Sequence, residues 1–211
     1  MFHDRTDAAK RLASLLWEYK NKGYLVLAIP RGGVIIADTV CQELGSELGL
    51  VVVKKMTAPF QEETAIGAVA EDGTAVLDED AIDDFSIPKE YVEDEKFNVM
   101  LEIRRRVDAY MARKLQTDFS NRRVILVDDG IATGLTMQCA VGYVKSKKPS
   151  EIIVATPVAP VGIVKKLEAE VDTVVVVEMP EELYAVGNLY ESFEQLSDDD
   201  IIRVVKKYTL K

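Results

Sequence analysis

The sequence has few of the side chains that hold soft metal ions. Its 211 residues include two cysteines and one histidine, too few for the Cys/His clusters of structural zinc sites. We therefore expect any bound metal to be a hard cation held by oxygen. Cys41 and Cys139 lie within apolar helical patterns and are predicted to be reduced core residues.

Long apolar runs and excess positive charge are also missing. No run reaches the roughly 18 apolar residues of a membrane-spanning helix, so no membrane contact is expected. The first seven residues are charged and lack the apolar core of a secretion signal, which predicts a cytoplasmic protein. With 26 basic against 36 acidic residues, the formal net charge is −10. This balance argues against a nucleic-acid partner, whose phosphates require basic side chains.

The strongest chemical signal is one strand, loop and helix start. Residues 124–127 are wholly apolar, which is typical of a strand buried on both faces. The run stops at Asp128 and Asp129, and a loop of small residues at 130–134 leads into a predicted helix over 135–147. The acidic pair and the loop should therefore lie at the carboxyl end of a strand.

Such a corner suits a phosphorylated sugar. Loop amides and the positive end of the helix dipole would face an anion, and the hydroxyls of Thr133 and Thr136 add donors. Asp128 and Asp129 would accept hydrogen bonds from sugar hydroxyls or hold a cation through water. The alternative is a generic α/β strand end with a metal or receiver-type site.

A second turn carries similar chemistry. Pro30-Arg31-Gly32-Gly33 follows a predicted strand over residues 24–29 and precedes a helix that runs to Leu44. The two glycines let the backbone approach a ligand closely, and the forked guanidinium of Arg31 suits phosphate oxygens. Taken alone, the turn is equally compatible with a tight βα connection and a surface arginine.

The first of these segments resembles the phosphoribosyl pyrophosphate (PRPP) signature of type I phosphoribosyltransferases, in which four apolar residues and two acids precede a loop ending Thr-Gly-x-Thr. The resemblance implies that Asp128 and Asp129 bind the ribose hydroxyls and hold Mg²⁺ through water or PRPP. It assigns the pyrophosphate to the turn at Arg31, Gly32 and Gly33. The PRPP-binding loop would comprise Gly130, Ile131, Ala132, Thr133, Gly134, Leu135 and Thr136.

Two lysines follow a predicted buried strand at residues 50–53. Lys54 and Lys55 are either solvated or directed at the pyrophosphate, where several members of the family place a basic residue. The resemblance implies that the catalytic residues are Arg31, Asp128, Asp129 and Lys55.

The acceptor is left open by the sequence. In the family, a hood built from terminal residues contacts the base, and the candidates here are Tyr184, Val186, Gly187 and Tyr190. These side chains could equally pack at the sheet edge. Hypoxanthine–guanine and xanthine–guanine enzymes carry a third aspartate three positions after the second acid, where this chain has Ala132, as adenine and uracil enzymes do. The Arg-Gly-Gly turn is instead similar to that of xanthine–guanine enzymes, so the two motifs point to different acceptors.

The order of elements predicts an α/β fold, a parallel β-sheet flanked by helices, in one domain over residues 1–211. We expect a core over about 24–178, a flap or hairpin insertion over about 56–80, and a hood from 1–22 and 179–211. The expected core strands are residues 24–29, 50–53, 124–127, 152–156 and 173–177. The insertion should contain a loop at 57–63 and a hairpin of 65–70 with 75–78.

Two helices complete the expected fold. A long amphipathic helix over residues 89–115 should bury a stripe that includes Phe97, Leu101 and Tyr110. Its Arg104-Arg105-Arg106 triplet is either a solvated face or a group that reaches the pyrophosphate or a dimer partner. Residues 198–200, three aspartates, should cap a short terminal helix.

The resemblance implies a Mg²⁺-dependent enzyme that transfers the 5-phosphoribosyl group from PRPP to a nucleobase or related nitrogen acceptor and releases pyrophosphate. The chain is also similar to a branch of uncharacterised prokaryotic phosphoribosyltransferases that share its Pro-Arg-Gly-Gly turn and its Ala-Val-Gly-x-x-Tyr tail. The alternatives are a non-catalytic PRPP-binding regulator or sensor and an unrelated α/β phosphosugar enzyme. A homodimer is expected, as in many members of the family.

Overall fold

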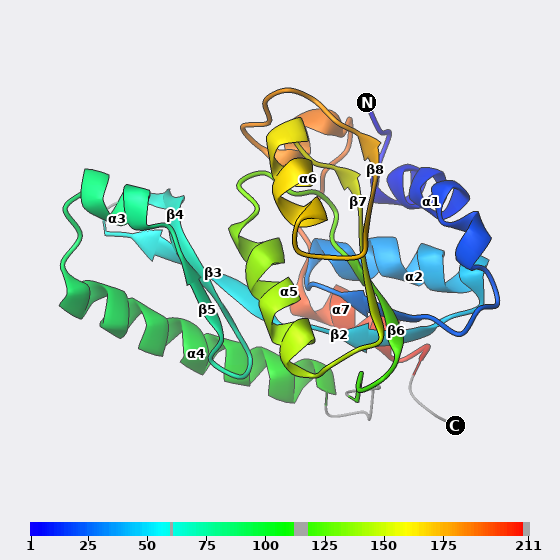
Figure 1. The fold of residues 1–211 in the computed structure, drawn as a ribbon, viewed down its shortest axis with the longest axis horizontal. Helices are drawn as coiled ribbons and strands as arrows, with labels where there is room; N and C mark the ends of the chain where they lie inside the picture. Colours follow the sequence, from blue (N-terminus) through cyan, green and yellow to red (C-terminus); the bar gives the residue numbers. More distant parts are fainter. Residues whose placement is uncertain (60, 112–117, 209–211) are drawn as a thin grey trace.

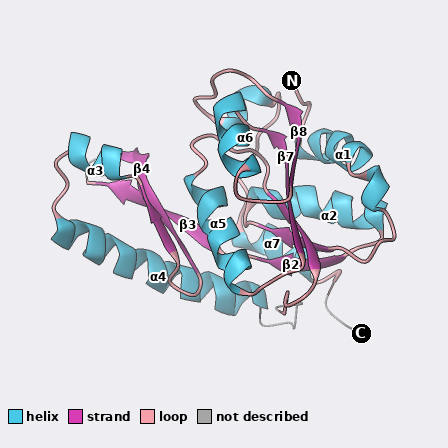
Figure 2. Cartoon of the chain, viewed as in Figure 1, coloured by secondary structure: helices cyan, strands magenta, loops and turns pink. Residues whose placement is uncertain are grey.

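The structure is a computed structural model that describes residues 1–59, 61–111 and 118–208. At its centre is a five-stranded parallel sheet in the order β2-β1-β6-β7-β8 (Figures 1 and 2). The predicted α/β fold with a parallel sheet is therefore confirmed. Its strands are β1 (Leu25–Ala28), β2 (Glu47–Leu50), β6 (Arg123–Val127), β7 (Glu151–Val158) and β8 (Thr173–Glu178).

Helices cover both faces of this sheet, which is why its strands are almost continuously apolar. Val26 and Ala28 of β1 face one core, and Leu25 and Leu27 face the other. The first core lies against α1 (Arg5–Leu15), α2 (Gly32–Leu44) and α7 (Asp198–Val205), and the second against α5 (Leu135–Ser146) and α6 (Val161–Glu168). Figure 1 shows α1 and α2 on the opposite side of the sheet from α5 and α6.

A second unit, called the arm below, projects from the sheet on the left of Figure 1. It comprises β3 (Val53–Ala58), β4 (Gln61–Ala70), β5 (Ala75–Leu77), α3 (Glu79–Asp84) and α4 (Lys89–Met111). Its three strands form an antiparallel sheet in the order β3-β4-β5. The predicted hairpin is present, with Gly73 at a φ of 90° in the turn between β4 and β5.

Two predicted boundaries in this region are wrong. The strand expected at residues 50–53 is divided, because Leu50 ends β2 of the parallel sheet and Val53 begins β3 of the arm. Both sheets bury this apolar run, so its composition could not indicate where the chain leaves one sheet for the other. The loop expected at 57–63 is largely strand, since β3 continues to Ala58 and β4 begins at Gln61.

The predicted stripe on α4 is only partly correct. Tyr110 is buried as predicted, whereas Phe97 is 64% exposed and Leu101 is 48% exposed. Val99 and Ile103 are buried in their place, on the side of the helix that packs against the small sheet and α7. Apolar side chains occur around much of this helix, and the position of the small sheet decides which of them are covered. Residues 112–115, the predicted end of the helix, lie outside the described residues.

The terminal helix is capped one residue earlier than predicted. Ser197 is the N-cap of α7, and its side chain and that of Asp200 form a reciprocal capping box. Asp198 instead accepts hydrogen bonds from Tyr110 at 2.6 Å and from Arg105 at 2.9 Å. Arg105 therefore joins α4 to α7 and does not contact the acidic pair. Arg106, like Arg105, pairs with Glu102 on the surface of α4.

The strand order locates the place where a ligand would bind. The chain moves outward from β1 to β2 and then returns to the other side of β1 with β6. Open parallel sheets bind ligands at such a switch point, beyond the carboxyl ends of the strands. Among the described residues, no helix is both long enough and apolar enough to cross a membrane.

Candidate functional site

The two loops singled out from the sequence meet at this switch point. Ala28 at the end of β1 is paired in register with Val127 at the end of β6, so the turn after β1 lies beside the acidic pair after β6. A Cβ added to Gly32 would lie 1.8 Å from Oδ2 of Asp129, and one added to Gly33 would lie 2.7 Å from the carbonyl oxygen of Val127. Side chains are excluded here because the two loops are in contact.

The acidic pair opens onto a pocket of about 170 Å³. Gly134 has a φ of 86°, which favours glycine, and it caps the N-terminus of α5. The first amides of α5 have no partners within the helix and face outward with the positive end of its dipole. The pocket is lined by Lys55, Asp128, Asp129, Gly130, Ile131, Ala132, Thr133, Gly134, Thr136, Met137 and Val186.

One hydroxyl in this pocket lacks a partner. Oγ1 of Thr136 is buried and makes no hydrogen bond with the described residues. A buried donor without a partner is unfavourable, so this atom favours a ligand that accepts from it. Leu135, by contrast, has its side chain in the core beneath α5, and only its backbone amide can serve an anion.

The two lysines of β3 are separated by the pleat of the strand. Lys55 lines the pocket, and its positive charge lowers the pKa of Asp128. Lys54 is the residue before it on β3, so its side chain points to the other face of that strand. The structure thus brings one member of the predicted pair to the acidic residues.

Asp128 is held in an environment that disfavours its charge. Burial and the neighbouring charge of Asp129 raise the pKa of Asp128 well above its usual value. Its Oδ1 accepts a hydrogen bond from the amide of Asp129 at 2.8 Å, and this bond and Lys55 oppose the shift only in part. A site that keeps so unfavourable a pair of carboxylates is typical of ligand binding.

A residue that sequence reasoning missed completes the site. The Nε of Arg5, in the first turn of α1, lies 2.7 Å from Oδ2 of Asp129. Its Nη1 donates to the carbonyl oxygen of Glu194 at 2.8 Å, and its guanidinium lies 3.8 Å from the ring centroid of Phe193. Arg5 belongs to no motif and is 124 residues from its partner, so no signal in the sequence could have identified it.

A second cleft, of about 360 Å³, lies on the other side of Asp129. Arg31 and Gly32 at the start of α2 form one wall, and Arg5 and residues 193–196 form the others. Asp129 lines this cleft and the first pocket. The two loops predicted to bind anions therefore lie on either side of Asp129.

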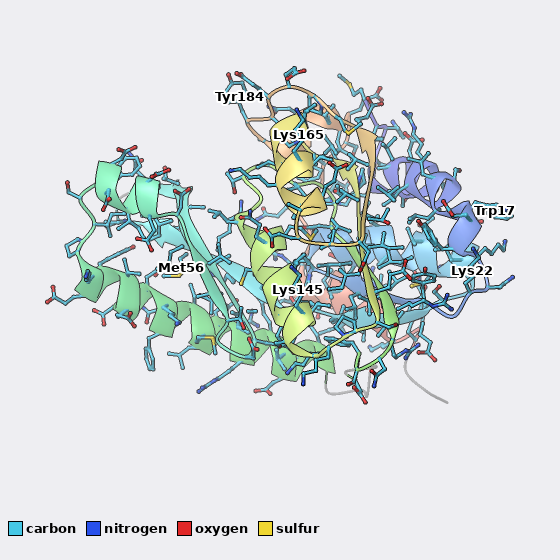
Figure 3. All side chains as sticks on the ribbon, in the orientation of Figure 1. Trp17, Lys22, Met56, Lys145, Lys165 and Tyr184 are labelled. Atoms are coloured by element: carbon cyan, nitrogen blue, oxygen red, sulfur yellow. The ribbon has the colours of Figure 1, made fainter. Side chains whose placement is uncertain are left out.

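The four predicted base-pocket residues do not form one pocket. Val186 lines the pocket at the acidic pair, and Gly187 packs close to the ring of Phe193. Tyr190 is buried, and its hydroxyl donates to the carbonyl oxygen of Asp129 at 2.6 Å. Tyr184 is 86% exposed and lies at the outer edge of the molecule beside α6 (Figure 3).

The donor set is compatible with Mg²⁺ bound together with a substrate. No cluster of three or more His, Cys, Asp or Glu side chains suited to a metal occurs in the described part of the chain. Mg²⁺ often takes one or two protein carboxylates and completes its shell with water and substrate phosphates. Asp128 and Asp129 could supply that share.

The comparisons with known proteins agree with this geometry. The family model described as "Phosphoribosyl transferase domain" matches residues 2–190. The chain belongs to the phosphoribosyltransferase family. The family predicted from the two loops is therefore confirmed.

Relatives of this phosphoribosyltransferase extend the match to almost the whole chain. "Putative phosphoribosyl transferase Rv0571c" of Mycobacterium tuberculosis is 34% identical over 202 residues, which are 96% of this chain and 46% of that protein. The chain thus spans less than half the length of the curated relatives that it matches. Among solved structures, TT1426 from Thermus thermophilus is 36% identical, with a TM-score of 0.79 over 99% of both chains.

The contact between the two loops predicts a specific cost for a methyl group at Gly32. Because the added Cβ would overlap Asp129, Gly32→Ala should lower the free energy of unfolding by about 1–3 kcal/mol. Gly162→Ala in the first turn of α6 is the matched control, since a Cβ there meets nothing within 4 Å. Urea unfolding measures the free energy of unfolding of both variants. If Gly32→Ala is as stable as Gly162→Ala, the two loops are not in tight contact.

The raised pKa of Asp128 predicts how stability depends on pH. Unfolded aspartate ionises at about pH 3.9, whereas native Asp128 holds its proton to higher pH. The wild type should therefore lose stability as pH rises from about 4 through the raised pKa. Asp128→Asn keeps an acceptor for the amide of Asp129 but cannot ionise, so it should gain stability relative to the wild type as pH rises. Urea unfolding at about pH 5 and 8 measures the difference in free energy of unfolding between the two proteins. A difference that does not change with pH would contradict the raised pKa of Asp128.

Proposed function

We propose that this phosphoribosyltransferase moves the 5-phosphoribosyl group of PRPP to a nucleobase or related nitrogen acceptor, with Mg²⁺, and releases pyrophosphate. The observation that carries the proposal is the pair of loops, each leading into a helix N-terminus, on either side of Asp128 and Asp129. PRPP has the same order of groups, with a 5′-phosphate, two ribose hydroxyls and a pyrophosphate.

Each loop has a role in this proposal. The loop at 130–136 and the start of α5 would hold the 5′-phosphate, with the unpartnered hydroxyl of Thr136 as one donor. Asp128 and Asp129 would accept hydrogen bonds from the ribose hydroxyls. The amides at Gly32 and Gly33 and the guanidinium of Arg31 would bind the pyrophosphate.

The reaction breaks the bond between the anomeric carbon and a pyrophosphate oxygen, and the bonding electrons leave with the pyrophosphate. The acceptor nitrogen forms the new bond with its lone pair and then loses a proton. Mg²⁺, when bound, neutralises charge on the leaving group. Arg31 and the start of α2 would stabilise the same developing charge, and binding of the distant 5′-phosphate would hold the reacting carbon in position.

The acceptor is proposed only as a nitrogen nucleophile. Ala132, in the position of the aspartate of 6-oxopurine enzymes, lines both the phosphate pocket and an open groove of about 460 Å³. Pro160, Ile163 and Leu183 give this groove an apolar wall that suits a flat ring. It contains Tyr184 but not the other three predicted base-pocket residues.

The remaining expectations about the whole protein belong to the same proposal. We place it in the cytoplasm, where PRPP and nucleobases would be available to it. We expect a homodimer, and α4, with its exposed Phe97 and Leu101, offers an apolar surface for the second copy.

The ribose role of the acidic pair is tested by replacing both carboxyl groups with amides. The double variant Asp128→Asn with Asp129→Asn should weaken PRPP binding in the presence of Mg²⁺ by roughly a hundredfold, since a hydrogen bond to a charged group contributes about 1.5–3 kcal/mol. Isothermal titration calorimetry measures the affinity.

The matched control uses another pair of adjacent aspartates. Asp83 and Asp84, at the end of α3, are exposed and lie on the arm away from the site, so Asp83→Asn with Asp84→Asn makes the same two chemical changes elsewhere. This variant should bind PRPP as the wild type does. An equal affinity in all three proteins would remove the ribose role from Asp128 and Asp129.

A further inference from the structure

Arg5 is hydrogen-bonded to Oδ2 of Asp129, a carboxylate oxygen that the proposed function assigns to a ribose hydroxyl. Its Nε donates to Oδ2 of Asp129 at 2.7 Å, and the two side chains are only 11% and 14% exposed. If Asp129 accepts a hydrogen bond from a ribose hydroxyl, the guanidinium and the hydroxyl compete for the same carboxylate. PRPP binding and the ion pair between Arg5 and Asp129 are therefore linked.

The guanidinium of Arg5 also lies within reach of a second binding site, the cleft at the start of α2. Arg5 lines the 360 Å³ cleft with Arg31 and Gly32, so two guanidiniums and the start of α2 border one space. The acidic groups at that cleft are Asp129 and Glu194, and Glu194 meets Arg5 through its backbone carbonyl. In a protein with a net charge of −10, two arginines at one cleft favour a multiply charged anion.

The setting of Arg5 allows such an exchange. Its guanidinium rests on the ring of Phe193, and stacking on an aromatic face does not depend on one fixed hydrogen-bond partner. Its backbone is fixed by α1, which begins after the N-cap Asp4. A change of side-chain rotamer can thus redirect the donors of Arg5 while the helix remains in place.

We infer that Arg5 is a counterion exchanged by the substrate: it neutralises Asp129 in the free protein and transfers to the pyrophosphate when the ribose hydroxyls take its place. This inference rests on the proposed function and adds to it a pyrophosphate ligand from outside both loops. Arg5 connects the two halves of the substrate, because occupying the pyrophosphate cleft draws the guanidinium away from the ribose site.

Exchange makes opposite predictions for the two halves of PRPP. Removing the guanidinium should weaken pyrophosphate binding by about tenfold or more, the usual effect of losing a hydrogen bond between charged groups. The same change should tighten binding of ribose 5-phosphate, because Asp129 no longer has a competing partner. If Arg5 only supported the structure of the site, removing its guanidinium would weaken the binding of both ligands, since the acidic pair would lose its hydrogen-bond partner.

The experiment titrates pyrophosphate with Mg²⁺ and ribose 5-phosphate separately into the wild type, Arg5→Gln, Arg5→Lys and Arg11→Gln. Arg11 is the matched control, because it lies on the same helix and pairs with Asp7 at the surface. Arg11→Gln should bind both ligands as the wild type does. Arg5→Lys keeps the charge beside Asp129 but lacks the fork, so it should weaken pyrophosphate binding without destabilising the fold.

The outcomes separate the inference from the proposed function. A wild type that binds neither ligand contradicts the proposed function itself. If the wild type binds both ligands, the exchange requires that Arg5→Gln weaken pyrophosphate binding and tighten ribose 5-phosphate binding. Any other result, including weaker pyrophosphate binding with unchanged ribose 5-phosphate binding, overturns the exchange and leaves the proposed function intact. If Arg5→Gln does not fold, Arg5→Lys decides, and unchanged pyrophosphate binding in that variant overturns the inference.

Discussion

The site depends on the close contact between two loops at the carboxyl ends of β1 and β6. Gly32 and Gly33 lie so close to Asp129 and Val127 that no side chain fits between them. The register of the two strands sets this contact, and both strands are fixed by cores on the two faces of the sheet. The helices that cover the sheet thus hold the two loops, which we propose to bind anions, in fixed contact with each other.

Charge is the second constraint, because the protein is acidic and its proposed ligand is a polyanion. The site draws its cations from separate parts of the fold: Arg5 from α1, Arg31 from the turn after β1 and Lys55 from the arm. Arg5 pairs with Asp129, Arg31 lines the cleft that Asp129 also lines, and Lys55 lines the pocket at both carboxylates. The two carboxylates raise each other's energy when both are ionised. In the free protein Arg5 neutralises Asp129, while burial raises the pKa of Asp128. Unfavourable electrostatics of this kind are typical of a site whose charges are balanced only when its ligand is bound.

The sequence predicted the parallel sheet and both loops because these features are local. A buried strand, an acidic pair and a glycine turn can each be recognised from a few consecutive residues. The division of residues 50–53 between two sheets and the buried face of α4 depend on tertiary packing, which composition does not encode. Arg5 is the clearest limit, since its partner Asp129 lies 124 residues away and only the fold brings them together.

The central claim is that both loops hold one molecule, and the affinity of PRPP relative to its two halves tests it most directly. With Mg²⁺ present, calorimetry on the wild type would compare PRPP with pyrophosphate and with ribose 5-phosphate. Because one molecule that spans both loops loses the entropy of association only once, PRPP should bind far more tightly than either half. A PRPP affinity no higher than that of the better half would show that the two loops do not share a ligand.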